Sequence, residues 1–260
     1  MYIDVHTHLN FTDFGDPDGT VERIHAAGVD TFINVGYDLP SSETSRQIAE
    51  RYPHAFFTAG LQPTELKKCK ESDLYRIEEL AKHPLCVAVG EIGLDYHYED
   101  TDKPLQHTMF VAQIELANSL GLPVQIHSRD CAEDMLRVLE QNAGKLTHGF
   151  MLHCYSHSAE MALRFAELGA YFSFGGTCTF RGSKKVKKSV QALPMERILS
   201  ETDSPYLTPE PLRGVFPNTP ANIPYITRTL AELKGLSVEE TARRIRENAR
   251  RLFHKIRLNG

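Results

Sequence analysis

The sequence lacks any hydrophobic run long enough to form a membrane-spanning helix. Its strongest apolar run, residues 85–90, has only the length of a β-strand, whereas a membrane helix needs about 18 apolar residues. The first residues also lack the basic and apolar regions of a secretory signal. We therefore expect a protein that is not inserted in a membrane and that works in the cytoplasm.

Cysteine is scarce, and basic charge is not in excess. The five cysteines, at positions 69, 86, 131, 154 and 178, are scattered and odd in number, which is typical of reduced thiols and argues against a disulfide framework. The 29 basic and 34 acidic residues give a net charge of −5. The chain therefore lacks the excess of positive charge that is typical of proteins that coat nucleic acid. An anionic ligand must therefore be held by a local positive field, and no obligate protein partner is indicated.

What the sequence does contain is a regular alternation of short apolar segments and helix-like segments along its 260 residues. Strands are predicted near residues 2–6, 30–35, 55–59, 85–90, 123–126, 149–153, 170–174 and 197–201. Helices are predicted near residues 20–27, 41–51, 73–82, 104–120, 130–142, 158–168, 184–192 and 219–234. Eight such units predict a (β/α)₈ TIM barrel that fills a single α/β domain over residues 1–260. A doubly wound open sheet is the alternative, because periodicity alone does not distinguish an open sheet from a closed barrel.

Two features follow the eighth predicted strand. A proline-rich stretch at residues 205–224 is too long for a simple connection, and long ordered loops of this kind are often functional. From Ser237 onward, apolar residues recur at helical spacing, which predicts one extra C-terminal helix on the outside of the barrel. Ser237 and Glu240 have the spacing of a capping pair at the start of that helix.

Side chains of metal-binding type occur at the ends of the predicted strands. In a barrel the C-terminal strand ends meet at one mouth, which is the usual position of an active site. His6 and His8 are two positions apart on an extended segment, so their side chains leave on the same face. Each residue alone has an ordinary structural explanation, such as a core histidine or a salt-bridged acid, but six together are better explained by metal binding. The candidate ligands are His6, His8, Glu91, His127, His153 and Asp203.

Six ligands are more than one tetrahedral ion needs, so the set predicts two divalent metal ions. We expect His6, His8 and Asp203 on one ion, His127 and His153 on the other, and Glu91 as the bridge. Nitrogen and oxygen ligands without thiolate suit Zn²⁺ or Mn²⁺, and Mg²⁺ is possible. Two such ions against two carboxylates leave about +2, which attracts anions. Paired ions can also generate hydroxide and promote phosphodiester cleavage, with Glu91 and Asp203 as catalytic residues and Asp203 as the general base.

Several motifs occur in order along nearly the whole chain. They are Asp-Val-His-Thr-His-Leu at 4–9, Gly-Glu-Ile-Gly-Leu-Asp-Tyr at 90–96, His-Ser-Arg-Asp at 127–130, Leu-His-Cys-Tyr-Ser at 152–156, Glu-Thr-Asp-Ser-Pro-Tyr-Leu at 201–207, and Asn248 followed by Leu252 and Phe253. Together they resemble the motifs of the TatD family of metal-dependent hydrolases. The resemblance implies a metal-dependent (β/α)₈ hydrolase of the amidohydrolase group, whose members include 3′→5′ DNases. It also implies the same metal roles for the six candidate ligands, and nucleic-acid ends as the substrate.

The chain departs from the family pattern at two places. Where the family usually has Gly-x-His-Pro, this sequence has Gln62, which can hydrogen-bond a phosphate or a water but cannot carry a proton. The family's Arg-Gly-Lys-x-Asn-x-Pro loop appears at residues 213–220 without the lysine and one residue longer. These departures favour an alternative function, the hydrolysis of a carboxylic ester, amide or lactone by the same two ions. A metal-binding protein without turnover is disfavoured, because all six ligand positions are filled.

Residues outside the ligand set are candidates for contact with the substrate. Arg129 has the chemistry to grip a phosphate, and the alternative is a structural pair with Asp130. Arg213 and Asn218 lie in the proline-rich stretch, where loop packing is the alternative. We predict Gln62, Arg129, Arg213 and Asn218 as substrate-binding residues. Asp4 shares the inward face of the first strand with His6 and is expected to orient a ligand, and Asp95 to support the site or cap a turn.

Overall fold

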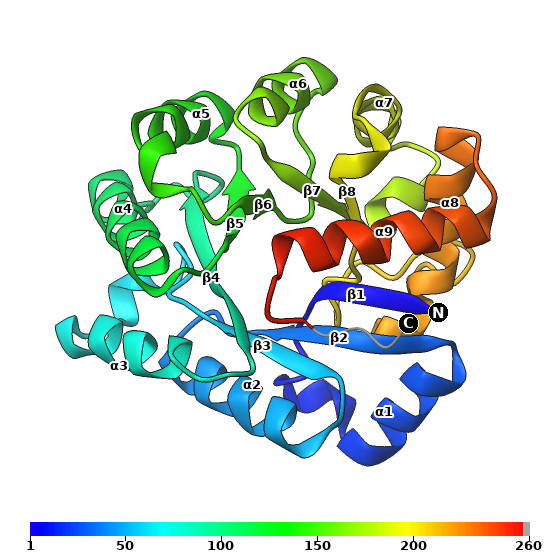
Figure 1. Cartoon of the computed structure of the whole chain (residues 1–260), viewed down its shortest axis with the longest axis horizontal. Coiled ribbons are helices and arrows are strands. Elements are labelled where there is room, and N and C mark those ends of the chain that lie inside the picture. Colours follow the sequence, from blue (N-terminus) through cyan, green and yellow to red (C-terminus); the bar gives the residue numbers. More distant parts are fainter. Residues whose placement is uncertain (257–260) are drawn as a thin grey trace.

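The computed structural model describes residues 1–256, so the last four residues of the predicted domain lie outside the described range. Eight parallel strands form one sheet in sequence order, surrounded by helices (Figure 1). The strands are β1 (Tyr2–Thr7), β2 (Val29–Val35), β3 (Ala55–Ala59), β4 (Cys86–Asp95), β5 (Val124–Arg129), β6 (Phe150–Leu152), β7 (Tyr171–Phe174) and β8 (Ile198–Ser200). All eight predicted strands are present, although β4 and β5 continue beyond their predicted ends.

Hydrogen bonds join the first strand to the last and close the barrel. The Asp203 amide donates to the His6 carbonyl at 2.9 Å, and the His8 amide donates to the Ser204 carbonyl at 3.0 Å. The Ser200 hydroxyl donates to the Ile3 carbonyl at 2.9 Å. The predicted (β/α)₈ barrel is thus confirmed, and the alternative of an open doubly wound sheet is excluded.

The helices of the barrel fall where the sequence predicts them, with shifts of a few residues at their ends. They are α1 (Pro17–Ala26), α2 (Leu39–Arg51), α3 (Glu71–Ala81), α4 (Lys103–Leu120), α5 (Ala132–Gln141), α6 (Ala159–Glu167), α7 (Lys184–Ala192) and α8 (Ile223–Lys234). Short 3₁₀ helices lie at Thr12–Phe14, Leu66–Lys68, Ala143–Lys145, Gly176–Thr179, Met195–Arg197 and Pro220–Asn222. Helix α1 begins earlier than predicted, because Asp16 caps it and Pro17 suits its first turn. Within residues 1–256, no helix combines the length and the apolar character needed to traverse a bilayer.

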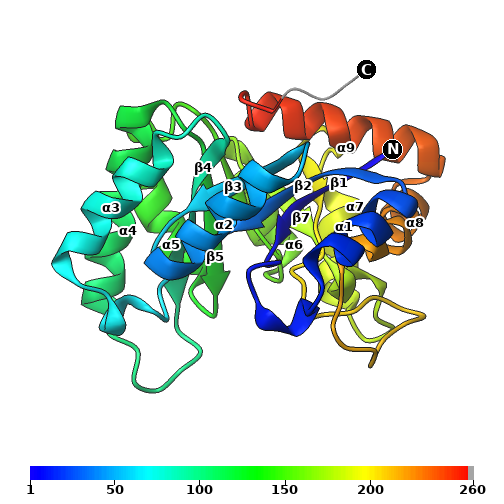
Figure 2. The same cartoon turned by 90° about the horizontal axis from the view of Figure 1, so that it is seen from below.

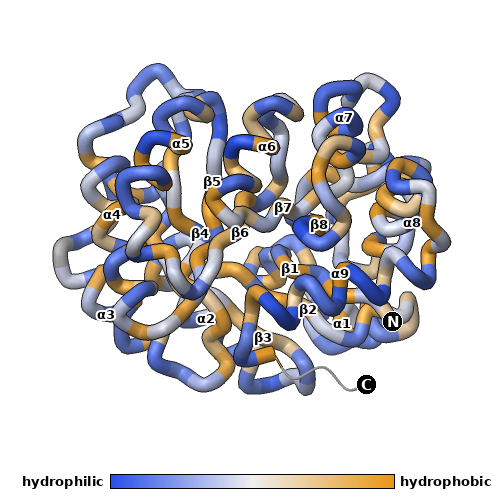
Figure 3. Tube along the Cα trace, turned by 45° about the horizontal axis from the view of Figure 1, so that its top comes forward, coloured by the Kyte–Doolittle hydropathy of each residue, from blue (hydrophilic) through white to orange (hydrophobic). Residues whose placement is uncertain are grey.

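The core consists of strand side chains and the helix faces that cover them. Fully buried residues such as Ile3, Phe32, Val89 and Phe172 come from four different strands and belong to one cluster. In Figure 3 the central strands carry much of the hydrophobic colour, while the outer turns of the helices and the loops are mostly hydrophilic. Burial of this apolar surface stabilises the barrel. It thereby holds the C-terminal ends of the strands, and the residues that follow them, in fixed positions.

The extra C-terminal helix, α9 (Val238–Leu252), is also present. The Ser237 hydroxyl accepts a hydrogen bond from the Glu240 amide at 3.1 Å, as the sequence predicts for its cap. The Asn248 amide group donates to the Met195 and Ile198 carbonyls at 2.8 and 2.9 Å, where β8 begins. In Figure 2, α9 lies along one end of the barrel and the long loops extend from the other. Helix α9 therefore covers the N-terminal strand ends and leaves the mouth at the C-terminal ends open.

Candidate active site

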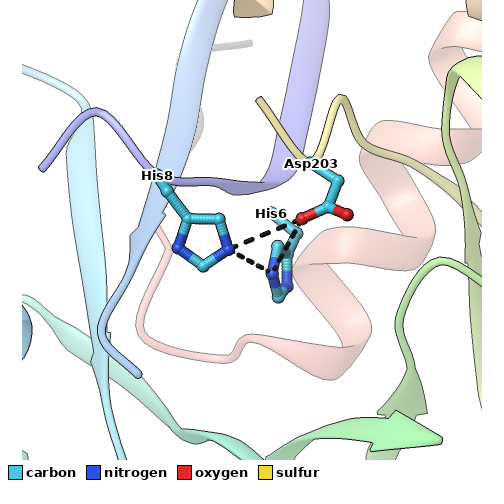
Figure 4. A group of neighbouring side chains, drawn as sticks. All are labelled: His6, His8 and Asp203. Carbon is cyan, nitrogen blue, oxygen red and sulfur yellow. Dashed lines mark hydrogen bonds and ion pairs between the residues drawn. The ribbon is translucent and has the colours of Figure 1, made fainter. Parts of the chain in front are cut away.

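The six predicted ligands lie together at the mouth of the barrel. His6 lies on β1 with His8 just beyond it, Glu91 lies on β4, His127 on β5, and His153 and Asp203 follow β6 and β8. His6 Nε2 lies 3.1 Å from His8 Nε2. Asp203 Oδ1 lies 3.7 Å from His6 Nε2 and 3.5 Å from His8 Nε2, so these three side chains point toward one another (Figure 4).

Glu91 stands between this group and a second pair of histidines. Its Oε2 atom lies 3.6 Å from His6 Nε2 and 3.8 Å from His8 Nε2. Its Oε1 atom lies 2.8 Å from His127 Nδ1 and 3.0 Å from His153 Nε2. Those two ring nitrogens are themselves 3.1 Å apart. Each oxygen of one carboxylate thus faces one pair of imidazoles.

The second ring nitrogens of His6 and His8 are held by carbonyl oxygens. His6 Nδ1 lies 3.0 Å from Gln125 Oε1, and the Gln125 amide nitrogen donates to the Val5 carbonyl at 2.9 Å. His8 Nδ1 lies 3.0 Å from the Val35 carbonyl. Because these oxygens only accept, both Nδ1 atoms carry the ring hydrogen. Both Nε2 atoms then present a lone pair, which is the form of histidine that binds a metal.

The second ring nitrogens of His127 and His153 face carboxylates instead. His127 Nε2 lies 2.8 Å from Asp95 Oδ2, which gives Asp95 the supporting role proposed from sequence. His153 Nδ1 lies 3.8 Å from Glu201 Oε1, and the other Glu201 oxygen accepts a hydrogen bond from the Ser173 hydroxyl. Glu201 has no exposed surface. A buried carboxylate behind each ring keeps negative charge close to this pair.

Two of these supporting residues, Gln125 and Glu201, do not figure in the sequence-based predictions. The signal for Gln125 is its spacing, because it precedes His127 by two positions on β5 and therefore points to the same face. Glu201 precedes Asp203 by two positions in the Glu-Thr-Asp motif, but it lies beyond the end of β8. The two-residue spacing of a strand could therefore have predicted that Gln125 points into the site, but it is a weaker guide for Glu201.

The donor set fits divalent metal ions. His6, His8 and Asp203 place one ligand atom each within 4.8 Å of one another, and so do Glu91, His127 and His153. All these atoms are nitrogen or oxygen, which suits Zn²⁺ or Mn²⁺. Among the described residues, His153 Nδ1 and Glu201 Oε1 are buried atoms without a hydrogen-bond partner, so the contact between His153 and Glu201 is not fully satisfied by protein groups. Together with His6, these two residues also form a third group that could hold an ion.

Both carboxylates of the ligand set are ionised at neutral pH. Burial alone would raise the pKa of Glu91, but His153 and His127 outweigh burial and hold that pKa well below its ordinary value. Burial would also raise the pKa of Asp203, but the neighbouring side chains of His8, His153 and His6 lower it to about 2. Both side chains therefore offer the charged oxygens that a cation requires.

Asp4 acts on the backbone and not on a histidine ring. Its Oδ1 atom accepts the His6 and Thr202 amide hydrogens, both at 3.1 Å. Its Oδ2 atom accepts the Thr202 hydroxyl at 2.5 Å. Complete burial raises the pKa of Asp4 to about 8. Asp4 thus orients His6, as expected from sequence, by tying β1 to the segment that follows β8.

A pocket of about 320 Å³ opens over the ligands, and two of the four predicted substrate-binding residues line it. Gln62 Oε1 accepts hydrogen bonds from the Thr64 amide, at 3.0 Å, and from the Thr64 hydroxyl. The Arg129 guanidinium lies 5.9 Å from the centre of the Tyr98 ring in the same wall. The structure therefore brings Gln62 and Arg129 to the metal-ligand cluster.

The other two predicted substrate-binding residues do not line this pocket. Arg213 is exposed, lies 4.1 Å from the centre of the Phe180 ring and pairs with Glu210 at 4.0 Å. Asn218 has no exposed surface, and its amide donates to the Thr202 and Tyr206 carbonyls at 3.1 and 2.7 Å. The prediction of substrate contact was therefore wrong for Asn218, because its amide is used to satisfy carbonyls of the loop around Asp203.

Comparisons with known proteins find relatives along nearly the whole chain. A family model described as TatD-related DNase matches residues 3–254. The uncharacterized metal-dependent hydrolase YabD of Bacillus subtilis is 39% identical, with 97% of this chain and 99% of the relative covered. The 3′-5′ ssDNA/RNA exonuclease TatD of Escherichia fergusonii is 33% identical, with 96% and 98% covered. The crystal structure of YJJV, a TatD homologue from Escherichia coli K12, superimposes with a TM-score of 0.92 at 30% identity, with 97% and 98% covered.

Proposed function

The chain belongs to the TatD-related DNase family and is a metal-dependent hydrolase, and from this premise we propose that it cleaves phosphodiester bonds at the ends of nucleic-acid strands with two divalent metal ions. The observation that carries the proposal is the position of Glu91. One of its oxygens faces His6 and His8, and the other faces His127 and His153. A carboxylate in this position could be shared by two ions, and paired ions can stabilise both the attacking and the leaving oxygen of an in-line displacement at phosphorus.

The distances among the ligand atoms divide the ligand set between the two proposed ions. His6, His8 and Asp203 would hold one ion, His127 and His153 would hold the other, and Glu91 would bridge them. When bound, such ions polarise a phosphoryl oxygen and lower the pKa of a water molecule. Zn²⁺ and Mn²⁺ suit the four imidazoles best, and Mg²⁺ is the third candidate.

Asp203 is the proposed general base. Its side chain is 19% exposed, whereas that of Glu91 is only 4% exposed. Asp203 also lines the pocket, as Glu91 and Asp95 do, and its greater exposure than Glu91 leaves it open to a water molecule there. Because its pKa is lowered to about 2, it is deprotonated at neutral pH and can accept a hydrogen bond from that water.

Gln62 and Arg129 are the proposed contacts to phosphate oxygens. The Arg129 guanidinium has the fork of N–H donors that matches a phosphate, and the Gln62 amide group is a neutral donor beside it. The 3′-5′ ssDNA/RNA exonuclease TatD supplies the precedent for a nucleic-acid end as substrate. Arg213 lies outside the pocket, so we assign it a contact only with a longer strand.

The second candidate function is the hydrolysis of a carboxylic ester, amide or lactone. Gln62 favours it, because the pocket lacks a proton-carrying side chain at the position where the family pattern has histidine.

We also propose a cytoplasmic location for the protein. The five free cysteines support it, because thiols stay reduced in that compartment.

One experiment separates the two functions. Protein reconstituted with Zn²⁺, Mn²⁺ or Mg²⁺ is incubated with end-labelled single-stranded DNA and, in parallel, with a panel of carboxylic esters, amides and lactones. We expect stepwise shortening of the DNA, and Gln62→His is expected to accelerate it severalfold. Intact DNA ends under every metal, together with turnover of an ester or lactone, would reject the nuclease function.

A further inference from the structure

Four aromatic rings form a connected row that leads outward from the metal-ligand cluster. We call this row, Phe11, Tyr37, Tyr206 and Phe216, the aromatic ledge. The centre of the Phe11 ring lies 5.5 Å from that of Tyr37 and 6.0 Å from that of Tyr206. Tyr206 and Phe216 are 6.2 Å apart. The row begins at His8, whose ring lies 5.9 Å from Phe11 and 5.8 Å from Tyr37.

Much of the aromatic ledge faces solvent. Tyr206 is 53% exposed and Phe216 is 56% exposed, while Phe11 and Tyr37 are partly buried. The four residues come from the segments that follow β1, β2 and β8. Contiguous exposed rings from separate segments mark a binding surface more often than a structural need. Phe11, Tyr37 and Tyr206 also line the pocket that holds the metal ligands, so whatever occupies this surface reaches the cluster.

The same pocket also has a second chemistry. Arg129 supplies a cation, close to the ring of Tyr98, which is 52% exposed. Gln62 and Thr64 add polar groups. The pocket therefore offers both aromatic faces and phosphate-binding donors. An unpaired nucleotide, with a planar base and an anionic backbone, matches both.

We propose that the aromatic ledge stacks the terminal base of the nucleic-acid strand that is to be cleaved. Stacking on aromatic side chains tolerates any base, because every base has a π-face. This inference rests on the proposed phosphodiesterase function, and it assigns recognition of the terminal base to Phe11, Tyr206 and Phe216, none of which is a proposed metal ligand.

The position of the aromatic ledge favours a substrate over a protein partner. The ledge ends at His8, so a base stacked on Phe11 or Tyr206 brings its own phosphate to the ligand cluster. A partner protein would gain nothing from this continuity with the metal site.

The test compares two single-stranded DNA oligomers that differ only at the terminal nucleotide to be removed, which is either normal or abasic. We expect the wild-type protein to cleave the normal end about tenfold faster, measured as kcat/KM, because loss of one stacked base removes about that factor. Tyr206→Ala and Phe216→Ala are expected to bring this ratio close to one, and Tyr206→Phe is expected to keep it. Tyr75→Ala, at an exposed tyrosine of α3, is the matched control and is expected to keep the wild-type ratio.

A second readout does not depend on turnover. An oligomer that ends in 2-aminopurine loses fluorescence when that base stacks on an aromatic ring. We expect quenching by wild-type protein and by Tyr206→Phe, and little quenching by Tyr206→Ala. Two results would reject base stacking on the aromatic ledge and leave the phosphodiesterase function standing. One is an equal kcat/KM of the wild-type protein for the normal and the abasic end. The other is equal quenching by wild type and by Tyr206→Ala. Strong quenching without cleavage of any DNA would instead reject the phosphodiesterase function and retain the stacking surface.

Discussion

The two halves of the ligand cluster place negative charge differently. His6 and His8 are backed by the neutral oxygens of Gln125 and Val35, and both form ion pairs with Glu91 and with Asp203, which faces the pocket. His127 and His153 are backed by the buried carboxylates Asp95 and Glu201.

This difference assigns separate tasks to the halves. A carboxylate behind an imidazole raises its basicity and fixes its orientation, whereas a carboxylate at the pocket can exchange a proton with a bound water. We therefore propose tight metal binding for the half with His127 and His153, and proton transfer for the half with Asp203. The first three of the four predictions that follow test this division.

The largest expected effect is that of Asp203→Asn. This change removes both a ligand of the first half and the proposed base, so kcat should fall about 10³-fold. Turnover is measured on labelled DNA with the protein reconstituted in excess metal. Metal content per chain, measured by elemental analysis, should fall by no more than one of the two proposed ions. A rate near that of wild type would move the base elsewhere and would remove the main distinction between the halves.

Glu91→Gln should affect both halves at once. The amide lacks the negative charge that both pairs of histidines face, so we expect the purified protein to lose at least one of the two proposed ions. Elemental analysis of wild type and variant, prepared in parallel, measures the difference. An unchanged metal content would reject Glu91 as the bridge and would leave the halves as independent sites.

Glu201→Gln should weaken the second half alone. Glutamine still accepts the Ser173 hydroxyl but leaves no charge behind His153, and loss of such a partner lowers metal affinity about tenfold. Competition with a chelator measures the affinity of each site. Glu196→Gln removes the same charge from an exposed residue in the turn before β8 and serves as the control. Equal weakening of both sites would contradict the separate tasks of the halves.

The smallest expected effect concerns Asp4, the buried carboxyl beneath the first half. In the folded protein its pKa is raised to about 8, so between about pH 4 and pH 8 the unfolded chain has released a proton that the folded chain retains. Stability of the metal-free protein should therefore fall as pH rises through this range. Asp4→Asn cannot titrate at this position, so its free energy of unfolding should not show this fall. Relative to wild type, the free energy of unfolding of the variant should rise by about 1 kcal/mol or more between about pH 4 and pH 8. Denaturant unfolding at several pH values checks this, and parallel curves for both proteins would contradict the assignment.

The metal ligands could be predicted because each of them lies at or just beyond the end of a predicted strand. A (β/α)₈ pattern brings every C-terminal strand end to one mouth, so His6, Glu91 and His127 needed no knowledge of contacts to be grouped. The end of β4 was harder to predict. Glu91 and Asp95 are charged and suggest that the strand stops at residue 90, yet all ten residues of β4 are buried. Their charge is compensated by histidines from other strands, which sequence periodicity does not reveal.

The loop after β8 shows where sequence reasoning ends. Asn218 and Arg213 are both polar residues in a proline-rich segment, and composition gives no reason to treat them differently. Only the path of the chain shows that Asn218 lies inside the loop against two carbonyls, while Arg213 lies on its surface. Backbone carbonyls must be satisfied by some donor, but which side chain does so depends on distances that no local pattern encodes.

The seam between β1 and the segment after β8 passes directly through His6, His8 and Asp203. Thr7 and Ser204, whose hydroxyls are 2.5 Å apart across this seam, are separated by 197 positions in the chain. During synthesis on the ribosome, Glu91, His127 and His153 emerge long before Asp203, so an incomplete chain carries the whole second group of ligands but lacks Asp203 of the first. Occupancy of both proposed metal sites would therefore require synthesis at least as far as Asp203 and the joining of β1 to the segment after β8.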